Sequence, residues 1–391
     1  MRFTLRYLST ILHSRNAKLL LLCLIWLMGW QGTAAHAQVK WHPGHYYSAM
    51  YGAKKSAYTH ASNAIYQELE SNPALAGIQI RFKWHELETA KGVYNFKEID
   101  EHLERLSTMG SRQKRFFIVI ETRSFDTSSK LVPCYLTTST CSGYSDTYEG
   151  GIFPYKKTAK GPQFGNGIRL WNDGVRNRFV KLMQALGNRY NAHSHFEGIG
   201  LGETSMGIPL NANDVSAADI DRYYAAHLYI QDAMSKAFPN TITLQFTNFP
   251  RNRLAGFIAG LQLSRTALGG PDILIDDPGL NAINIPNQQD GAYSYYPRLS
   301  GTVALAPSVM PSNYLNTSMD ERVPSRQPSI DELLDFGRDR LLATHLFWSR
   351  DKPEDYYKEA FAKLQMLKIN GDPRVELQTD CPSAYGSCIT D

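Results

Sequence analysis

Acidic, amide and aromatic side chains recur in this sequence where short apolar runs end. Glu203 ends the run 197-EGIGLGE-203, and Glu121 ends the run 115-RFFIVIE-121. The other such residues at or beside the ends of apolar runs are His45, Tyr47, Arg81, Trp84, Gln245, Asn248, Asp276, Asp277 and Trp348. Carboxylates and amides hydrogen-bond to hydroxyl groups, and indole faces stack on pyranose rings. If the fold brings these residues to one opening, their combined chemistry is that of a sugar-binding site.

The elements that must position these residues follow from the apolar periodicity. Short β-rich runs alternate with longer amphipathic runs from Gln38 onward. Strands are expected at 42–51, 77–82, 115–121, 197–203, 241–246, 272–276, 301–307 and 342–348. Helices are expected at 58–71, 97–110, 175–190, 218–238, 252–263, 330–341 and 354–367.

Eight strands, most of them followed by a helix, predict an α/β fold with a parallel sheet closed into a (β/α)8 TIM barrel. The competing architecture is a doubly wound open sheet, but no glycine-rich phosphate loop follows the first strand. In a parallel barrel the carboxyl ends of all strands meet at one mouth, where active sites form. The residues at the strand ends are therefore expected to converge.

The stretch 124–170 is rich in Ser, Thr, Gly and Tyr and is expected to form a long loop at the barrel mouth, after the third strand. Four cysteines form two close pairs, Cys134 with Cys141 and Cys381 with Cys388. These spacings do not match zinc or redox motifs, so two local disulfides are expected in an oxidising compartment. The first of them would pin the long loop.

The N-terminus has the pattern of a secretory signal peptide. Basic residues precede the apolar run 19-LLLLCLIWLMGW-30, and small residues follow at Ala35 and Ala37. We expect cleavage after Ala37, a single domain over 38–391, a secreted or periplasmic protein and no stable membrane insertion after cleavage. The alternative, an uncleaved anchor, needs about 20 apolar residues, more than this run provides.

Composition excludes several classes of function. With 43% hydrophobic and 12% aromatic residues, the chain can bury a large core. Its net charge is only +4 and no basic tract stands out, so nucleic acid is not an expected partner. His193 and His195 are interpreted as part of a solvated loop rather than a metal site. No metal or cofactor is expected, and the oligomeric state is not predicted.

One segment resembles a known family. The stretch 81-RFKWHELETAKGVYNFKEID-100 is similar to the second-strand signature of clan A (β/α)8 glycoside hydrolases, notably the β-galactosidase-like and cellulase-like members. The resemblance implies that Arg81 is the active-site arginine. It places Glu203 in the slot of the general acid/base, with Gly202 where the family has Asn. It also implies that Trp348 forms the floor of a sugar subsite.

The sequence departs from this family at the seventh strand, where 301-GTVALAPSVMPSNY-314 has no acid to serve as the nucleophile. The expected sources of a second carboxylate are Asp277 or Asp276, and then Glu121. The sequence thus predicts a secreted glycoside hydrolase that cleaves a poly- or oligosaccharide, with Glu203 as general acid/base. The alternative function is a non-catalytic glycan-binding protein on a degenerate barrel. For Glu203 itself, the alternative to a catalytic or ligand-contacting role is a structural carboxylate that hydrogen-bonds a loop or pairs with Arg81.

Overall fold

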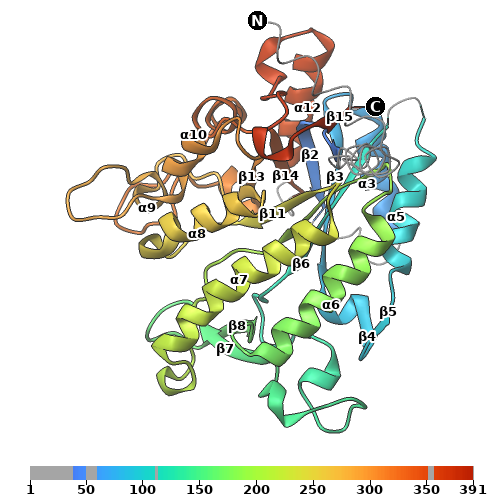
Figure 1. Cartoon of the computed structure of the whole chain (residues 1–391). Helices are drawn as coiled ribbons and strands as arrows, with labels where there is room; N and C mark the ends of the chain where they lie inside the picture. Colours follow the sequence, from blue (N-terminus) through green and yellow to red (C-terminus); the bar gives the residue numbers. More distant parts are fainter. Residues whose placement is uncertain (1–37, 50–59, 111–112, 351–355, 391) are drawn as a thin grey trace, which may run out of the picture. The chain divides into compact units, whose positions relative to one another are not determined.

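The computed structural model describes residues 38–49, 60–110, 113–350 and 356–390 (Figure 1). Residues Gln38–Asp391 form one compact unit. The predicted signal peptide, residues 1–37, lies outside the described residues. Within the described ranges, no helix is long and apolar enough to cross a membrane.

Eight parallel strands close into a barrel, as the alternating pattern predicts. In the order in which they neighbour one another they are β2 (Gly44–Ala49), β3 (Leu75–Lys83), β6 (Arg115–Glu121), β9 (Phe196–Leu201), β11 (Ile242–Phe246), β12 (Ala267–Gly270), β13 (Leu305–Val309) and β14 (His345–Ser349). Because β14 pairs with β2, the sheet has no free edge. The closed barrel is confirmed and the open doubly wound sheet is excluded.

Helices connect consecutive strands and lie outside the barrel (Figure 1). The main ones are α3 (His60–Ser71), α5 (Lys97–Ser107), α6 (Asp173–Tyr190), α7 (Ala217–Ala237), α8 (Arg251–Leu263), α11 (Ile330–Asp335) and α12 (Tyr356–Ile369). Polar caps set several of their starts: Asn172 accepts a hydrogen bond from the Val175 amide, and Ser216 forms a capping box with Asp219. The helix predicted at 330–341 is α11 followed by a π-helical turn over Phe336–Arg340.

The sixth strand differs from the prediction. The run 272–276 is not a strand, and β12 lies earlier, at 267-ALGG-270. A Cβ atom added at Gly269 would lie 2.5 Å from the ring of Phe246 on the neighbouring strand. The strand therefore needs glycine so that this ring fits, and a glycine-rich run lacks the β-branched residues that predict strands. As a result, 272–276 becomes part of the loop at the mouth.

Side chains of the strands alternate between the interior of the barrel and the helices around it. Tyr46, Phe117, Leu244, Phe246 and Phe347 belong to one buried cluster, which fills the interior. The intervening strand residues belong to a larger cluster shared with the helices. Glycine makes room inside the barrel, since a Cβ at Gly198 would lie 1.8 Å from the ring of Phe117.

The insertion after β6 is more ordered than the long loop that the sequence predicts. It contains an antiparallel hairpin of β7 (Ile152–Lys156) and β8 (Gln163–Ile168), to which β10 (Ile208–Pro209) adds a third strand. The predicted disulfide Cys134–Cys141 closes the preceding segment, with a Cα–Cα distance of 6.0 Å. An isolated bridge joins Arg123 to Gly167, so the hairpin is tied to the segment leaving β6.

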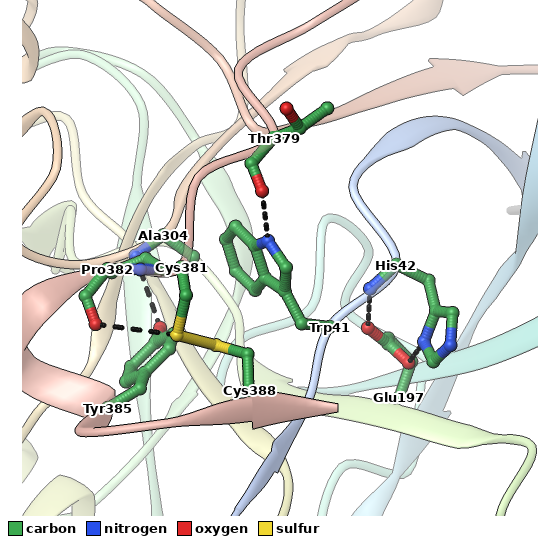
Figure 2. The surroundings of a disulfide bond; sticks show 9 residues. All are labelled: Trp41, His42, Glu197, Ala304, Thr379, Cys381, Pro382, Tyr385 and Cys388. Carbon is green, nitrogen blue, oxygen red and sulfur yellow. Dashed lines mark hydrogen bonds and ion pairs between the residues drawn. A yellow bond between two sulfur atoms is a disulfide. The ribbon is translucent and has the colours of Figure 1, made fainter. Parts of the chain in front are cut away.

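The end of the barrel at the amino ends of the strands lies opposite to the mouth. The last residues of the chain close it (Figure 2). The short strand β15 (Cys388–Ile389) pairs in parallel with β1 (Val39–Lys40), and the predicted disulfide Cys381–Cys388 holds it. Trp41 Nε1 donates to the Thr379 carbonyl at 2.7 Å. The Ala304 amide donates to the Tyr385 hydroxyl at 3.2 Å, directly before β13.

A buried carboxylate lies at the same end (Figure 2). Glu197 is fully buried and accepts hydrogen bonds from the His42 amide at 2.8 Å and from His42 Nδ1 at 2.7 Å. His345 Nε2 lies 3.9 Å away. Burial alone would raise the pKa of Glu197, but the interactions with His345 and His42 outweigh it and lower this pKa to about 2.

We expect Glu197→Gln to lower the free energy of unfolding by about 3 kcal/mol at pH 7, because it breaks a buried charged network. A lowered carboxyl pKa stabilises the fold above the pKa of the unfolded chain, near 4.5, and this contribution is lost as pH falls toward 2. The difference in the free energy of unfolding between variant and wild type, measured with urea, should therefore decrease below pH 4.5. As a control, Glu149→Gln, in an exposed ion pair with Arg169, should change stability by less than about 1 kcal/mol.

Candidate active site

Glu203 follows the carboxyl end of β9, and both neighbouring strands hold the backbone there. The Gly202 amide donates to the Ile120 carbonyl of β6 at 3.0 Å, and the Thr204 amide donates to the Phe246 carbonyl of β11 at 3.1 Å. Gln245 Nε2 donates to the Gly202 carbonyl at 2.6 Å. These bonds on either side of Glu203 fix the point from which its side chain starts.

Two further residues orient the Glu203 carboxylate. Asn248 Nδ2, after β11, donates to Glu203 Oε2 at 2.8 Å. Arg123 Nη2, after β6, lies 3.8 Å from Glu203 Oε1. The Glu203 side chain keeps 17% of its surface exposed. One carboxylate thus joins the ends of the third, fourth and fifth barrel strands while remaining accessible.

The Arg123 side chain also packs against aromatic rings in this part of the mouth. Its guanidinium donates to the Ser205 carbonyl and lies over the rings of Phe125, at 4.8 Å, and Tyr155, at 4.7 Å. Phe125 is 48% exposed and makes an edge contact with Phe164, which is 37% exposed. The exposed rings beside Glu203 therefore come from the insertion and the segment that leads to it.

Arg81 points into the barrel from β3. It is 7% exposed, its guanidinium lies 5.7 Å from the ring of Phe246, and its Nη2 donates to Met310 Sδ at 3.6 Å. Within the described residues, Arg81 Nε and the buried Ser308 Oγ have no hydrogen-bond partner. Buried polar groups are normally satisfied, so such atoms below the mouth suit a polar ligand or ordered water.

Asp272 is a second carboxyl at the mouth, and sequence reasoning missed it. It lies just beyond β12, where Asn313 Nδ2 donates to its Oδ1 at 3.0 Å. Burial raises the pKa of Asp272, the hydrogen bond from Asn313 lowers it, Glu203 raises it and Arg81 lowers it. The resulting pKa is about 6. The run 272–276 was expected to be a strand, which hid the first acid after the true sixth strand.

The acids that the sequence suggests as the second carboxylate, Asp277, Asp276 and Glu121, have contacts other than with Glu203. Asp277 caps α9 (Pro278–Asn281), accepting hydrogen bonds from the amides of Gly279 at 2.9 Å and Leu280 at 3.0 Å. Asp276 is exposed and lies 3.9 Å from Arg326. Glu121 is partly buried at the end of β6, paired in register with Lys83. Glu203 thus bonds to Asn248, whereas Asp277 Oδ2 accepts hydrogen bonds from the Ser318 hydroxyl at 3.5 Å and the Met319 amide at 3.4 Å.

The prediction that the rings of Trp84, Trp348, His45 and Tyr47 lie at the mouth is wrong. Trp84, Trp348, His45 and Tyr47 are buried between the barrel and its surroundings. Trp348 Nε1 donates to His45 Nδ1 at 3.0 Å, Tyr47 donates to Glu68, and Trp84 Nε1 donates to Glu88 at 2.7 Å. Strand alternation explains this, because Phe347 and Tyr46, not Trp348 and Tyr47, face the interior.

Two of the residues predicted to bind substrate, one from β3 and one that follows β11, do lie at the mouth. Arg81 and Asn248 lie at the mouth, whereas Gln245 faces α7 and acts as a support for the Gly202 carbonyl. Across the described ranges, no group of three His, Cys, Asp or Glu side chains could hold a metal ion. The polar groups described at the mouth are the carboxyls of Glu203 and Asp272, the guanidinium groups of Arg81 and Arg123, and the side-chain amides of Asn248 and Asn313.

A comparison with models of protein families finds no match, and neither does a comparison with curated protein sequences. Solved structures do match. The catalytic domain of β-amylase from Paenibacillus polymyxa has a TM-score of 0.53 and 10% identity, covering 79% of this chain and 92% of that chain. A β-galactosidase from the psychrophilic Marinomonas ef1 has a TM-score of 0.51 and 9% identity, covering 86% and 62%. These similarities confirm, at the level of fold, the resemblance to barrel glycoside hydrolases.

Asp272→Asn should stabilise the protein at alkaline pH. A carboxyl pKa raised from 3.8 to about 6 favours the fold below pH 3.8, and that contribution is lost as pH rises through 6. At pH 8 the Asp272 carboxyl of the folded wild type is ionised, although its buried surroundings disfavour the charge. The variant should therefore gain up to about 3 kcal/mol in the free energy of unfolding at pH 8.

The same variant should differ little from the wild type near pH 3.5, where the Asp272 carboxyl is mostly protonated in both the folded and the unfolded state. Urea unfolding at the two pH values measures the effect. Equal stability at pH 8, or a loss, would mean that Asp272 is an ordinary structural carboxylate. Asp339→Asn, in an exposed ion pair with Arg338, is the matched control and should show no such pH-dependent gain.

Proposed function

We propose that this protein is a glycoside hydrolase that acts on a poly- or oligosaccharide with Glu203 and Asp272 as its two carboxyl groups. The observation that carries the proposal is the pair itself. The two acids follow the fourth and sixth strands, with Asn248 of the fifth strand between them and bonded to Glu203. Asp272 has a pKa of about 6. Pairs of carboxyls in different environments are what glycosidic cleavage uses.

In this mechanism Asp272 donates its proton to the glycosidic oxygen as the bond to the anomeric carbon breaks. Glu203 either accepts a proton from the water that attacks the anomeric carbon, or attacks that carbon itself to form a glycosyl ester. In the second route the ionised Asp272 takes a proton from the water that breaks the ester and releases the sugar. The sugar passes through an oxocarbenium-like state in either case. Asp272 thus takes the proton-donor role that the sequence suggests for Glu203, and Glu203 takes the role of base or nucleophile, for which the seventh strand has no acid.

The surroundings of the pair support a sugar as the substrate. Arg81 and Ser308 offer buried polar atoms below the mouth that lack protein partners within the described residues. Phe125 and Phe164 expose ring faces beside Arg123, the ion-pair partner of Glu203. Ring faces for the apolar side of a pyranose and polar atoms for its hydroxyl groups are the two kinds of contact that such a ligand needs.

We also propose that the protein is exported. The basic and apolar pattern of residues 1–37, with cleavage after Ala37, supports this. The disulfides Cys134–Cys141 and Cys381–Cys388 support it independently, because such bonds persist in oxidising compartments.

The second candidate is a non-catalytic glycan-binding protein on the same barrel. One observation favours it: β13 and the following turn Pro311–Tyr314 contain no acid. The two candidates differ in a single measurable property, the release of reducing ends.

Purified protein should release reducing ends from at least one member of a polysaccharide panel. Glu203→Gln should reduce this turnover by at least about 10³-fold, because the carboxylate takes part in bond cleavage. Glycan binding measured by calorimetry should change little. Glu376→Gln, in an exposed ion pair with Lys368, is the matched control and should retain full activity. Turnover that survives in Glu203→Gln would remove this residue from the mechanism, and binding without turnover in the wild type would favour the second candidate.

The leaving group should separate the roles of the two acids. Asp272→Asn should lose hydrolysis of natural glycans but retain much of it on aryl glycosides whose phenolate leaves without a proton. Glu203→Gln should lose both. The wild-type kcat/KM should fall as pH rises through about 6, where Asp272 loses its proton, and this limb should vanish in Asp272→Asn. The reverse pattern of leaving-group dependence would make Glu203 the proton donor.

A further inference from the structure

A cavity of about 530 Å³ lies on the insertion side of the barrel, away from Glu203. One wall comes from the segment after β3, with His85, Glu88 and Thr89. The opposite wall is the segment 127–138, whose last residues belong to the loop closed by Cys134–Cys141, and Asn166 of the hairpin completes it. The cavity is therefore built mainly by the insertion that distinguishes this chain from a plain barrel.

The lining of this cavity is rich in hydroxyl groups and carries little net charge. Six of its residues are Thr89, Thr127, Ser128, Ser129, Thr137 and Thr138, and its apolar part includes Leu131, Val132 and Ile152. Lys130 is the one cation among the lining residues. A mixed lining of hydroxyl, amide and aliphatic groups suits a neutral polyhydroxylated ligand better than a phosphorylated or strongly anionic one.

Glu88, the acid in the cavity wall, has its charge balanced by hydrogen-bonding partners within the protein. Glu88 is buried and accepts hydrogen bonds from Arg178 Nη2 at 2.5 Å, the Gly92 amide at 2.7 Å and the Tyr135 hydroxyl at 3.2 Å. Tyr135 lies in the loop closed by Cys134–Cys141. The same contacts that neutralise the carboxylate therefore fix the two walls against each other. A cavity held this way is preformed, so that a ligand does not have to order it.

Hydrogen bonds connect the cavity to the barrel mouth. Lys83, the last residue of β3, donates to the Ser129 hydroxyl. The Asn166 amide donates to Ser124 Oγ at 3.1 Å. Ser124 directly follows Arg123, the ion-pair partner of Glu203. The cavity and the carboxylate are thus on two sides of the segment that leaves β6.

We propose that this cavity binds about one or two neutral sugar units of the glycan whose glycosidic bond lies at Glu203 and Asp272, since it falls in the usual volume range of ligand sites. The preferred substrate is then an oligosaccharide longer than a disaccharide. The identity of the bond that is cleaved rests on the proposed function, whereas binding in the cavity can be tested without it.

The test blocks the cavity and leaves the carboxyls untouched. Thr137→Trp places a large ring at an exposed position of the lining. Ser139→Trp places the same ring two residues away on the same loop, exposed and outside the lining. Binding of maltohexaose, cellohexaose and xylohexaose, and of the matching disaccharides, is measured by calorimetry for both variants, the wild type and Glu203→Gln.

At least one hexasaccharide should bind the wild type, Ser139→Trp and Glu203→Gln alike, and should bind Thr137→Trp about tenfold or more weakly. A disaccharide that binds should follow the same order, because two sugar units fit the cavity on their own. Where turnover is detected, Thr137→Trp should raise KM for the hexasaccharide and leave hydrolysis of an aryl glycoside unchanged. Absence of hexasaccharide binding to the wild type, or equal loss in both tryptophan variants, overturns the cavity proposal. Binding that follows the cavity without any turnover overturns the hydrolase and keeps the cavity site.

Discussion

The two-residue alternation of side chains in a closed ring of parallel strands decides which residues of this protein can form a site. In β3, Arg81 points inward while Ile80 and Phe82 pack against the helices. In β14, Phe347 points inward and Trp348 outward. Because the barrel is closed, no strand can slide by one residue to exchange these faces without moving its whole apolar set. Whether a side chain reaches the mouth therefore depends on its position along the strand more than on its residue type.

That constraint explains how much the sequence could predict. The alternation of apolar runs predicts the barrel, and it puts Glu203, Arg81 and Asn248 at or near strand ends, which are their positions in the structure. The outward direction of Trp348 could not be derived, since both faces of a barrel strand are apolar and the pattern does not tell them apart. The shift of the sixth strand, which hid Asp272, depends on the ring of Phe246 facing Gly269, a contact between residues distant in sequence.

The two carboxyls at the mouth are held by the same device. The Asn248 side chain donates to Glu203 through Nδ2 while its Oδ1 accepts the Phe249 amide at 2.8 Å. Asn313 donates to Asp272 and accepts the amides of Met310 at 2.7 Å and Ile273 at 3.0 Å. In each case a backbone amide determines which way the side-chain amide faces, so that its NH₂ group is directed at the acid. The geometry of both acids is thus set by short loop segments that bond to their own backbone.

The closure of the amino-terminal end of the barrel has a consequence for how the protein can be handled or attached. Strands β1 and β15 run side by side there, on the face opposite the strand ends that carry Glu203 and Asp272. A linker, tag or solid support attached beyond β15 would leave from that far face. Attachment through that face would leave the mouth on the side of the protein that points away from the support.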